Sequence, residues 1–125
     1  MDLQDKRHRV VKSFAFAITG IKTAIRTERN MRIHLFLSGV VIPCAFLFSL
    51  SKVEWLLIIL LIGGMLSLEL LNTAIERVVD LYTEEYHPLA KQAKDLAAGA
   101  VLIYALVAII IGVVIFVPHF MVFFR

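Results

Sequence analysis

The chain has 125 residues, of which 60% are hydrophobic and only 18% are charged, and its mean hydropathy is +0.85. Soluble domains carry about 25% charged residues, so the composition excludes an ordinary soluble protein and indicates a single membrane domain over residues 1–125. The net charge of +3 does not indicate nucleic-acid binding, because the basic residues flank apolar stretches. Anionic lipid is the expected partner of these charges.

Residues 1–32 precede the first long apolar stretch and predict an amphipathic helix on the membrane surface. Its apolar stripe has the spacing i, i+4, i+7 and i+11, at Phe14, Ile18, Ile21 and Ile25. Glu28 continues this stripe three residues after Ile25, so its carboxylate could approach acidic residues of a membrane span. The alternative is an i, i+4 pair between Glu28 and Arg32 on a solvated face.

Three apolar stretches long enough to cross a bilayer follow in chain order. They cover residues 33–50, 55–75 and 97–117. Residues 51–54 leave room only for a turn, so the first two stretches predict a helical hairpin. Gly63 and Gly64 would allow close approach of another helix, and Pro88 suits the first turn of the helix that leads into the third stretch.

Basic residues are distributed unevenly around these stretches. Of the 13 lysines and arginines, all but Lys52 and Arg125 lie before the first stretch or between the second and third. The positive-inside rule then predicts a cytoplasmic N-terminus, a cytoplasmic loop over residues 77–95 and a C-terminus on the outside. No cleavable signal peptide is expected, because the first apolar stretch begins only after Arg32.

The second stretch carries acidic residues at membrane depth. At about 100° per residue, one helix face holds Glu69, Asn72, Glu76 and Asp80. An acidic side chain in this position costs about 2.5 to 3.5 kcal/mol on insertion scales, so such a group is expected to face a cation, a cavity or a polar partner. The face predicts a metal-dependent site near one membrane surface.

A second cluster of polar residues follows in the loop before the third stretch. It contains Thr83-Glu84-Glu85-Tyr86-His87-Pro88, followed by Lys91, Lys94 and Asp95. Phosphoryl transfer needs Mg²⁺, a cation for the phosphates and a group that deprotonates the attacking hydroxyl. Glu28 and Glu76 could hold the metal, and Lys94 could contact phosphate. Glu69 lies about two turns deeper among leucines, where it could act as general base on a lipid hydroxyl.

Several motifs resemble those of the prokaryotic diacylglycerol kinase and undecaprenol kinase family. They are Glu69-Leu70-Leu71-Asn72-Thr73-Ala74-Ile75-Glu76, Val78-Val79-Asp80, Glu85-Tyr86-His87 and Ala93-Lys94-Asp95. The resemblance extends over nearly the whole chain. It implies an all-α integral membrane kinase of the bacterial inner or plasma membrane, with a surface helix and three transmembrane helices per subunit. It further implies a homotrimer with sites shared between subunits, ATP as co-substrate and Mg²⁺ as cofactor.

The resemblance also implies roles for individual residues. Glu69 would be the catalytic base at the lipid substrate, Glu28 and Glu76 the metal ligands, and Asn72 and Asp80 supporting groups. The positions matched to the nucleotide site are Arg9, Phe16, Glu28, Glu76, Glu85, Tyr86, His87, Lys94 and Asp95. Phe16 stands where some members carry a tyrosine, so it offers no hydroxyl. Ala98, near the lipid pocket, replaces a serine found in some relatives.

The motifs Thr27-Glu28-Arg29-Asn30 and Arg32-Ile33-His34, with residues 85–90, resemble forms typical of Gram-positive undecaprenol kinases. The resemblance therefore favours undecaprenol as acceptor. Diacylglycerol is the alternative, because the chemistry requires only a primary hydroxyl near Glu69.

Two other classes of function are compatible with parts of the pattern. An ion or proton channel could be lined by Glu69, Glu76 and Asp80, but it would not need Lys94, Asp95 or Glu28. A structural subunit could use Asn72 for helix association, which leaves the glutamates unexplained.

Overall fold

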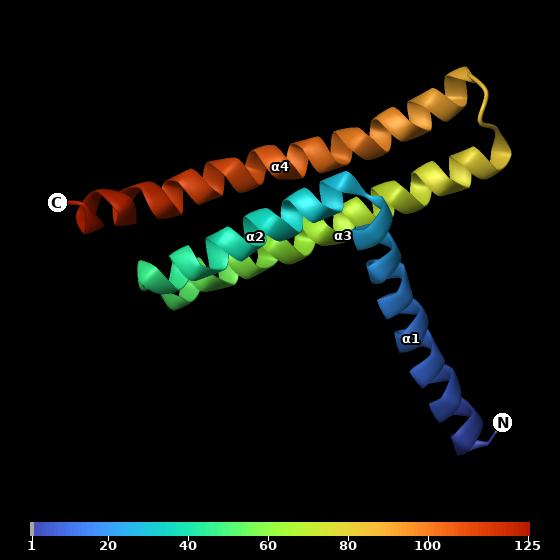
Figure 1. The fold of residues 1–125 in the computed structure, drawn as a ribbon, viewed down its shortest axis with the longest axis horizontal. Coiled ribbons are helices and arrows are strands. Elements are labelled where there is room, and N and C mark those ends of the chain that lie inside the picture. Colours follow the sequence, from blue (N-terminus) through green and yellow to red (C-terminus); the bar gives the residue numbers. More distant parts are fainter. Residues whose placement is uncertain (1) are drawn as a thin grey trace.

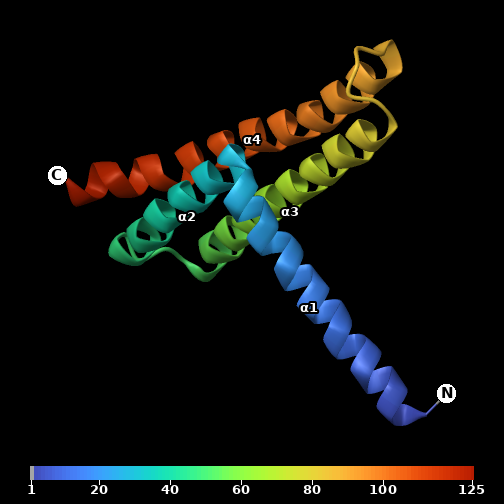
Figure 2. The same cartoon turned by 45° about the vertical axis from the view of Figure 1, so that its right-hand side comes forward.

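The computed structural model describes residues 2–125, which form four helices and no strand. They are α1 (Leu3–Thr27), α2 (Arg29–Leu47), α3 (Lys52–Tyr82) and α4 (Pro88–Phe123). Helices α2, α3 and α4 form a bundle, whereas α1 leaves the bundle at an angle and carries the N-terminus away from it (Figures 1 and 2). The all-α prediction is confirmed.

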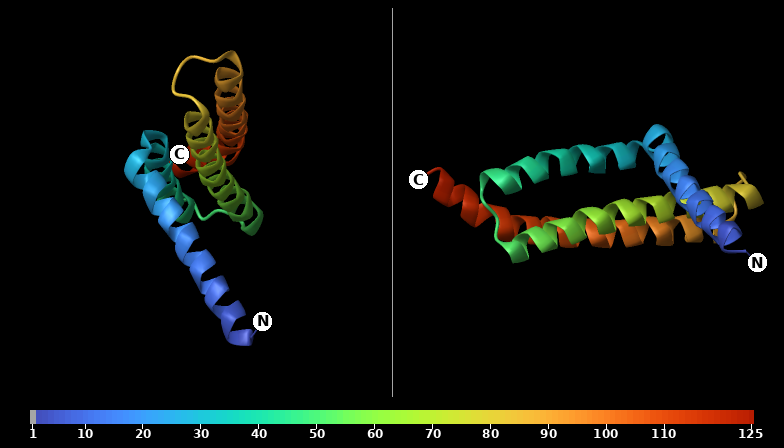
Figure 3. Two further views of the ribbon diagram at one scale, coloured as in Figure 1. Left: turned by 90° about the vertical axis from the view of Figure 1, so that its right-hand side faces the viewer. Right: turned by 90° about the horizontal axis from the view of Figure 1, so that it is seen from below.

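Helices α2, α3 and α4 are each long and apolar enough to cross a membrane, so the protein is a multi-pass membrane protein. The 19 residues of α2 extend about 28 Å, close to the thickness of about 30 Å of a hydrocarbon core. The 31 residues of α3 and 36 of α4 extend about 46 and 54 Å. Both continue past the α1–α2 junction to the loop that connects them (Figure 3), so this end of the bundle reaches beyond the apolar layer.

The turn of the α2–α3 hairpin lies at residues 48–51, and not at residues 51–54 as the sequence suggested. Ser51 caps α3: its Oγ accepts a hydrogen bond from the Glu54 amide at 3.2 Å, while Oε1 of Glu54 accepts one from the Ser51 amide at 3.0 Å. This capping box draws residues 52–54 into the first turn of α3. Ser49 reverses the chain with a φ of 51°.

The apolar core lies at the hairpin end of the bundle. Its buried members are Ala45, Leu50, Ile58 and Ile115. At the same end, Nε2 of His119 lies 2.9 Å from Oε2 of Glu54 and joins the end of α4 to the start of α3. Packing therefore fixes one end of the bundle, and the polar residues with predicted roles gather toward the other.

Only one of the two adjacent glycines makes a close helix contact. The Tyr104 hydroxyl of α4 donates a hydrogen bond to the Leu60 carbonyl of α3 at 2.7 Å, and a Cβ atom on Gly64 would overlap that hydroxyl. The space around Gly63 is open. The predicted close approach is confirmed at Gly64.

Candidate active site

The buried polar group of the bundle is Glu69, which is 3% exposed. Its Oε1 lies 3.2 Å from Nε2 of His34 in α2. His34 is five residues from the start of α2, which is about 7 Å along the helix axis. The carboxylate therefore lies inside the bundle but close to the end from which α1 leaves. Sequence reasoning missed His34 as a partner, although an ionisable side chain within the predicted span 33–50 was an available signal.

Asn72 lies nearly one turn beyond Glu69 on α3. Its Oδ1 atom is buried and has no hydrogen-bond partner among the described residues. Leaving a buried acceptor unpaired costs about 1 to 3 kcal/mol, so this position suits an acceptor whose donor comes from outside the isolated chain. The expected supporting role of Asn72 stays a prediction.

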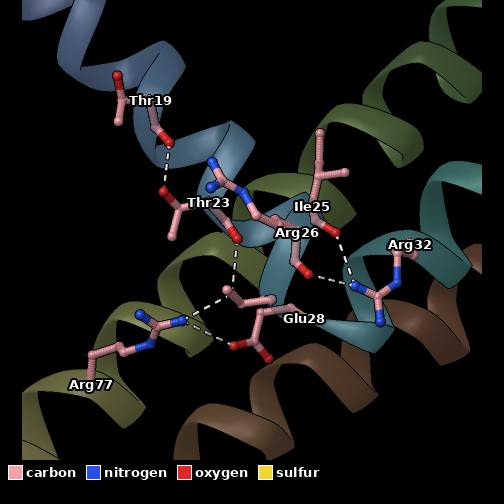
Figure 4. A network of polar contacts seen from close by, with 8 residues as sticks. Thr19, Thr23, Ile25, Arg26, Glu28, Arg32 and Arg77 are labelled. Atoms are coloured by element: carbon pink, nitrogen blue, oxygen red, sulfur yellow. Dashed lines mark hydrogen bonds and ion pairs between the residues drawn. The ribbon is translucent and has the colours of Figure 1, made fainter.

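Glu28 lies at the break between α1 and α2. Its backbone is extended, with φ −109° and ψ 116°, so the prediction that it continues the apolar stripe of a helix is wrong. Oε1 of Glu28 lies 3.4 Å from Nη2 of Arg77, which also donates to Oγ1 of Thr27 at 2.9 Å (Figure 4). The break turns the chain away from the bundle and brings Glu28 to α3.

The alternative prediction, an ion pair between Glu28 and Arg32, is also wrong. Nη1 of Arg32 donates instead to the carbonyl oxygens of Ile25 at 3.1 Å and Arg26 at 2.9 Å (Figure 4). These carbonyls belong to the last turn of α1, where helical acceptors lack partners within the helix. Arg32 thus stabilises the break and leaves the Glu28 carboxylate to Arg77.

The two predicted metal ligands come from this junction and from α3. Glu76 directly precedes Arg77, the residue that contacts Glu28. Among residues 2–125, no three His, Cys, Asp or Glu side chains gather closely enough to hold a metal ion. Mg²⁺ is commonly bound through one or two carboxylates, with water and phosphate oxygens completing its shell. The assignment of Glu28 and Glu76 as metal ligands stays a prediction.

A cavity of about 370 Å³ lies where α3 meets α4. It is lined by Val79, Thr83, Glu84, Glu85, Tyr86, His87, Ala90, Lys91, Lys94 and Asp95. Five of the nine positions matched to the nucleotide site thus line one cavity. Nζ of Lys94 donates to Oδ1 of Asp80 at 2.7 Å, and Lys91 forms an ion pair with Asp95. Lysines and carboxylates are therefore interleaved around this cavity.

The start of α4 fixes one wall of the cavity. Nδ1 of His87 accepts a hydrogen bond from the Leu89 amide at 3.2 Å and caps the helix. Pro88 occupies the first turn, as predicted. Because the cap holds the His87 ring at the helix start, the loop residues before it are anchored beside the cavity.

Three predicted site residues are not brought to these groups. Arg9 and Phe16 lie exposed on α1, which projects away from the bundle (Figure 1), and neither lines the cavity at the α3–α4 loop. Ala98 is exposed on α4, one turn beyond Lys94. One chain alone therefore assembles only part of the predicted site.

A buried glutamate, a carboxylate at the α1–α2 junction and a charged cavity at the α3–α4 loop are now placed in the fold, and a comparison with known protein families agrees with this arrangement. The family model described as prokaryotic diacylglycerol kinase matches residues 15–116. The chain belongs to this family. The resemblance inferred from the motifs around Glu69 and Lys94 is confirmed.

Individual members of the prokaryotic diacylglycerol kinase family support the assignment along most of the chain. An undecaprenol kinase of Bacillus subtilis (strain 168) is 54% identical over 121 residues, covering 94% of this chain and 98% of the relative. A diacylglycerol kinase of Synechocystis sp. is 46% identical over 85% of this chain and 61% of the relative. A diacylglycerol kinase of Haemophilus influenzae is 34% identical over 86% of this chain and 92% of the relative.

Proposed function

We propose that the chain is a Mg-ATP-dependent lipid kinase that transfers the γ-phosphoryl group of ATP to the hydroxyl of undecaprenol, giving undecaprenyl phosphate. The observation that carries this proposal is the buried carboxylate of Glu69, which lies on α3 toward the end of the bundle that holds the charged cavity. The identity of 54% with an undecaprenol kinase supports undecaprenol as acceptor. Diacylglycerol is the second candidate, because other relatives are diacylglycerol kinases.

Glu69 is proposed as the general base. It accepts the proton of the lipid hydroxyl while the oxygen of that hydroxyl forms a bond to the γ-phosphorus, and the bond between the γ-phosphorus and the bridging oxygen breaks to release ADP. The position of Glu69 between membrane helices suits an acceptor that arrives from the bilayer. Because Glu69 is only 3% exposed, little water can compete with the lipid hydroxyl.

The cavity at the α3–α4 loop is proposed to hold the nucleotide. Lys94 would contact phosphate, while Glu85, Tyr86, His87 and Asp95 contact the rest of ATP. Glu28 and Glu76 would hold Mg²⁺ together with phosphate oxygens. Bound Mg²⁺ supplies charge neutralisation on those oxygens. The Arg77 guanidinium would then release the Glu28 carboxylate, its present partner.

A homotrimer with sites shared between subunits is proposed as the working unit. Arg9 and Phe16 lie on a helix that leaves its own bundle, so they would complete the nucleotide site of another subunit. Ala98 is exposed and is proposed to contact the bound lipid. The buried Oδ1 of Asn72, which has no partner within residues 2–125, would support the catalytic centre. Many large apolar side chains of α2 and α4 are exposed in the single chain, which supports cover by lipid and by further subunits.

The orientation in the bacterial plasma membrane is proposed to be N-terminus inside and C-terminus outside, with α1 lying on the cytoplasmic surface. The cavity, the Glu28 junction and all basic residues except Lys52 and Arg125 then face the compartment that contains ATP. Membership of a kinase family leaves the channel and the purely structural alternatives without support.

The test is a comparison of acceptors. The purified chain in lipid bicelles is supplied with labelled ATP, Mg²⁺ and either undecaprenol or diacylglycerol at equal mole fraction. At equal mole fraction, we expect the labelled product of undecaprenol to form at least about tenfold faster than that of diacylglycerol. This ratio corresponds to a difference of about 1.4 kcal/mol in the activation free energy. A chelator should abolish both reactions. A preference for diacylglycerol would overturn the choice of acceptor, and no labelled lipid in either case would overturn the kinase itself.

A further inference from the structure

We infer that His34 is a positioning residue for the catalytic base: Nε2 of His34 lies 3.2 Å from Oε1 of Glu69, orients the carboxylate and leaves Oε2 to accept the proton of the lipid hydroxyl. This inference rests on the proposed function for the role of Glu69. It deepens that function by assigning an orienting partner from α2 to a base carried by α3.

The contact joins two side chains that are far apart in sequence and largely buried. Nε2 of His34 lies 3.2 Å from Oε1 of Glu69, and the two side chains are 21% and 4% exposed. No other ion pair or hydrogen bond of the Glu69 carboxylate is found within residues 2–125. Two other carboxylates at this end have partners of their own: Arg77 for Glu28 and Lys94 for Asp80. His34 therefore provides the side-chain partner of the buried Glu69 carboxylate.

The direction of this contact follows from the role proposed for Glu69. A general base is an ionised carboxylate with no hydrogen to donate, so in that state a proton between Nε2 and Oε1 belongs to His34, either as the neutral Nε2–H tautomer or as the imidazolium. Without this contact, the residues described, 2–125, offer the Glu69 carboxylate no other side-chain partner within ion-pair distance that would fix its orientation.

The geometry also restricts where the substrate hydroxyl can bind. With Oε1 engaged by His34 of α2, the acceptor oxygen available to a lipid is Oε2. The ring of His34 fixes the rotation of the carboxylate and so sets the direction in which Oε2 points. A role in packing alone would need only the volume of the imidazole and not its Nε2–H group.

The test separates the effect of the N–H donor of His34 from the effect of its side-chain volume. His34→Leu removes the donor and keeps a bulky side chain, while His34→Gln keeps an N–H donor near the position of Nε2. Ser38→Ala is the matched control: Ser38 lies one turn further along α2, is half-buried, and its Oγ donates to the His34 carbonyl at 2.8 Å. Glu69→Gln completes the set. Assembly of each variant is checked by size-exclusion chromatography.

Two readouts are compared. The first is steady-state kinetics, in which we expect His34→Leu to lower kcat by about 10- to 100-fold, as for loss of a hydrogen bond to a charged group, with KM for ATP unchanged. His34→Gln should recover most of kcat, and Ser38→Ala should equal the parent. The second readout is labelling by an apolar carbodiimide, which reacts with carboxyl groups, followed by mass spectrometry of the peptide that contains Glu69. Labelling should be several-fold faster in His34→Leu than in the parent, because Oε1 of Glu69 is then no longer covered by the imidazole ring.

The outcomes distinguish this inference from the proposed function. Parental turnover and parental labelling in His34→Leu would overturn the role of His34. Equal damage in His34→Leu and His34→Gln, with no change in labelling, would reduce His34 to a packing residue and overturn it as well. A parent chain that phosphorylates no lipid would overturn the proposed function. The carbodiimide reaction would still decide whether His34 holds the Glu69 carboxylate.

Discussion

Nζ of Lys94 in α4 donates a hydrogen bond to Oδ1 of Asp80 in α3 at 2.7 Å. The pair joins the two helices at the end of the bundle that contains the cavity, and Lys94 itself lines that cavity. Asp80 was expected only to support the acidic face of α3. Its contact with Lys94 shows how that support could work, because the carboxylate holds the ammonium group beside the space proposed for phosphate.

Replacing Lys94 by methionine should raise KM for ATP by at least about tenfold, because a charge-assisted contact to phosphate is lost. Lys91→Met is the matched control. Lys91 lines the same cavity but is paired with Asp95 one turn away on its own helix, so its loss should change KM by less than about threefold. Initial rates at varied ATP and saturating lipid measure both constants. Equal effects of the two substitutions would remove the specific phosphate contact from Lys94.

Replacing Glu69 by glutamine should abolish turnover without loss of assembly or nucleotide binding. The amide has the size of the carboxyl group but cannot accept the proton of the hydroxyl, and a general base contributes about 10² to 10⁴ in rate. Nucleotide binding is measured with a fluorescent ATP analogue, and turnover with labelled ATP. Glu54→Gln at the opposite end of α3 is the control, since it changes the same functional group far from the cavity. Ordinary turnover in Glu69→Gln would remove the assignment of the base.

Local patterns in the sequence predicted the helices well. Hydropathy over some 20 residues specifies a span without reference to its neighbours, and Pro88 marks the start of α4 by its own backbone restriction. The 3.6-residue period placed Glu69 and Asp80 on one face of α3. These features depend on residues close together in the chain, so one sequence was enough to predict them.

The contacts between helices could not be predicted in the same way. The break at Glu28 depends on Arg77, some fifty residues later, and the partner of Glu69 depends on how α2 packs against α3. A helical stripe that reaches Glu28 was the simplest local interpretation. It failed because the Arg32 guanidinium satisfies the last carbonyls of α1 and Arg77 receives the carboxylate, and neither interaction has a local pattern.

Replacing Arg77 by glutamine should lower the Mg²⁺ concentration needed for half-maximal activity. The ion pair between Arg77 and Glu28 competes with the metal for the same carboxylate. Because the Arg77 side chain is 53% exposed, the pair is worth no more than about 1 kcal/mol, so the shift should be about two- to fivefold. Activity is titrated with Mg²⁺ at constant free ATP.

The control for this titration is Arg26→Gln, which removes a neighbouring positive charge at the end of α1 without removing a side-chain contact to Glu28. It should leave the Mg²⁺ requirement nearly unchanged. A higher requirement in Arg77→Gln would mean that Arg77 assists binding of the metal or nucleotide and does not compete with it.

Replacing Gly64 by alanine should destabilise the bundle, because its Cβ would overlap the Tyr104 hydroxyl of α4. Overpacking of this kind costs about 1 to 3 kcal/mol, and here it would also disturb the hydrogen bond from Tyr104 to the Leu60 carbonyl. Gly63→Ala is the matched control on the adjacent residue, where a Cβ meets open space, and it should be neutral or slightly stabilising, since alanine favours helix. Unfolding in mixed micelles with increasing anionic detergent gives the midpoints.

A double-mutant cycle identifies the cause of the Gly64 effect. In a Tyr104→Ala background the obstructing ring is absent, so Gly64→Ala should lose most of its cost and the two substitutions should show a coupling of at least about 1 kcal/mol. The measurement uses the same detergent titration for all four chains. Additive effects would locate the sensitivity of Gly64 outside its contact with Tyr104, for example at a surface that another subunit covers.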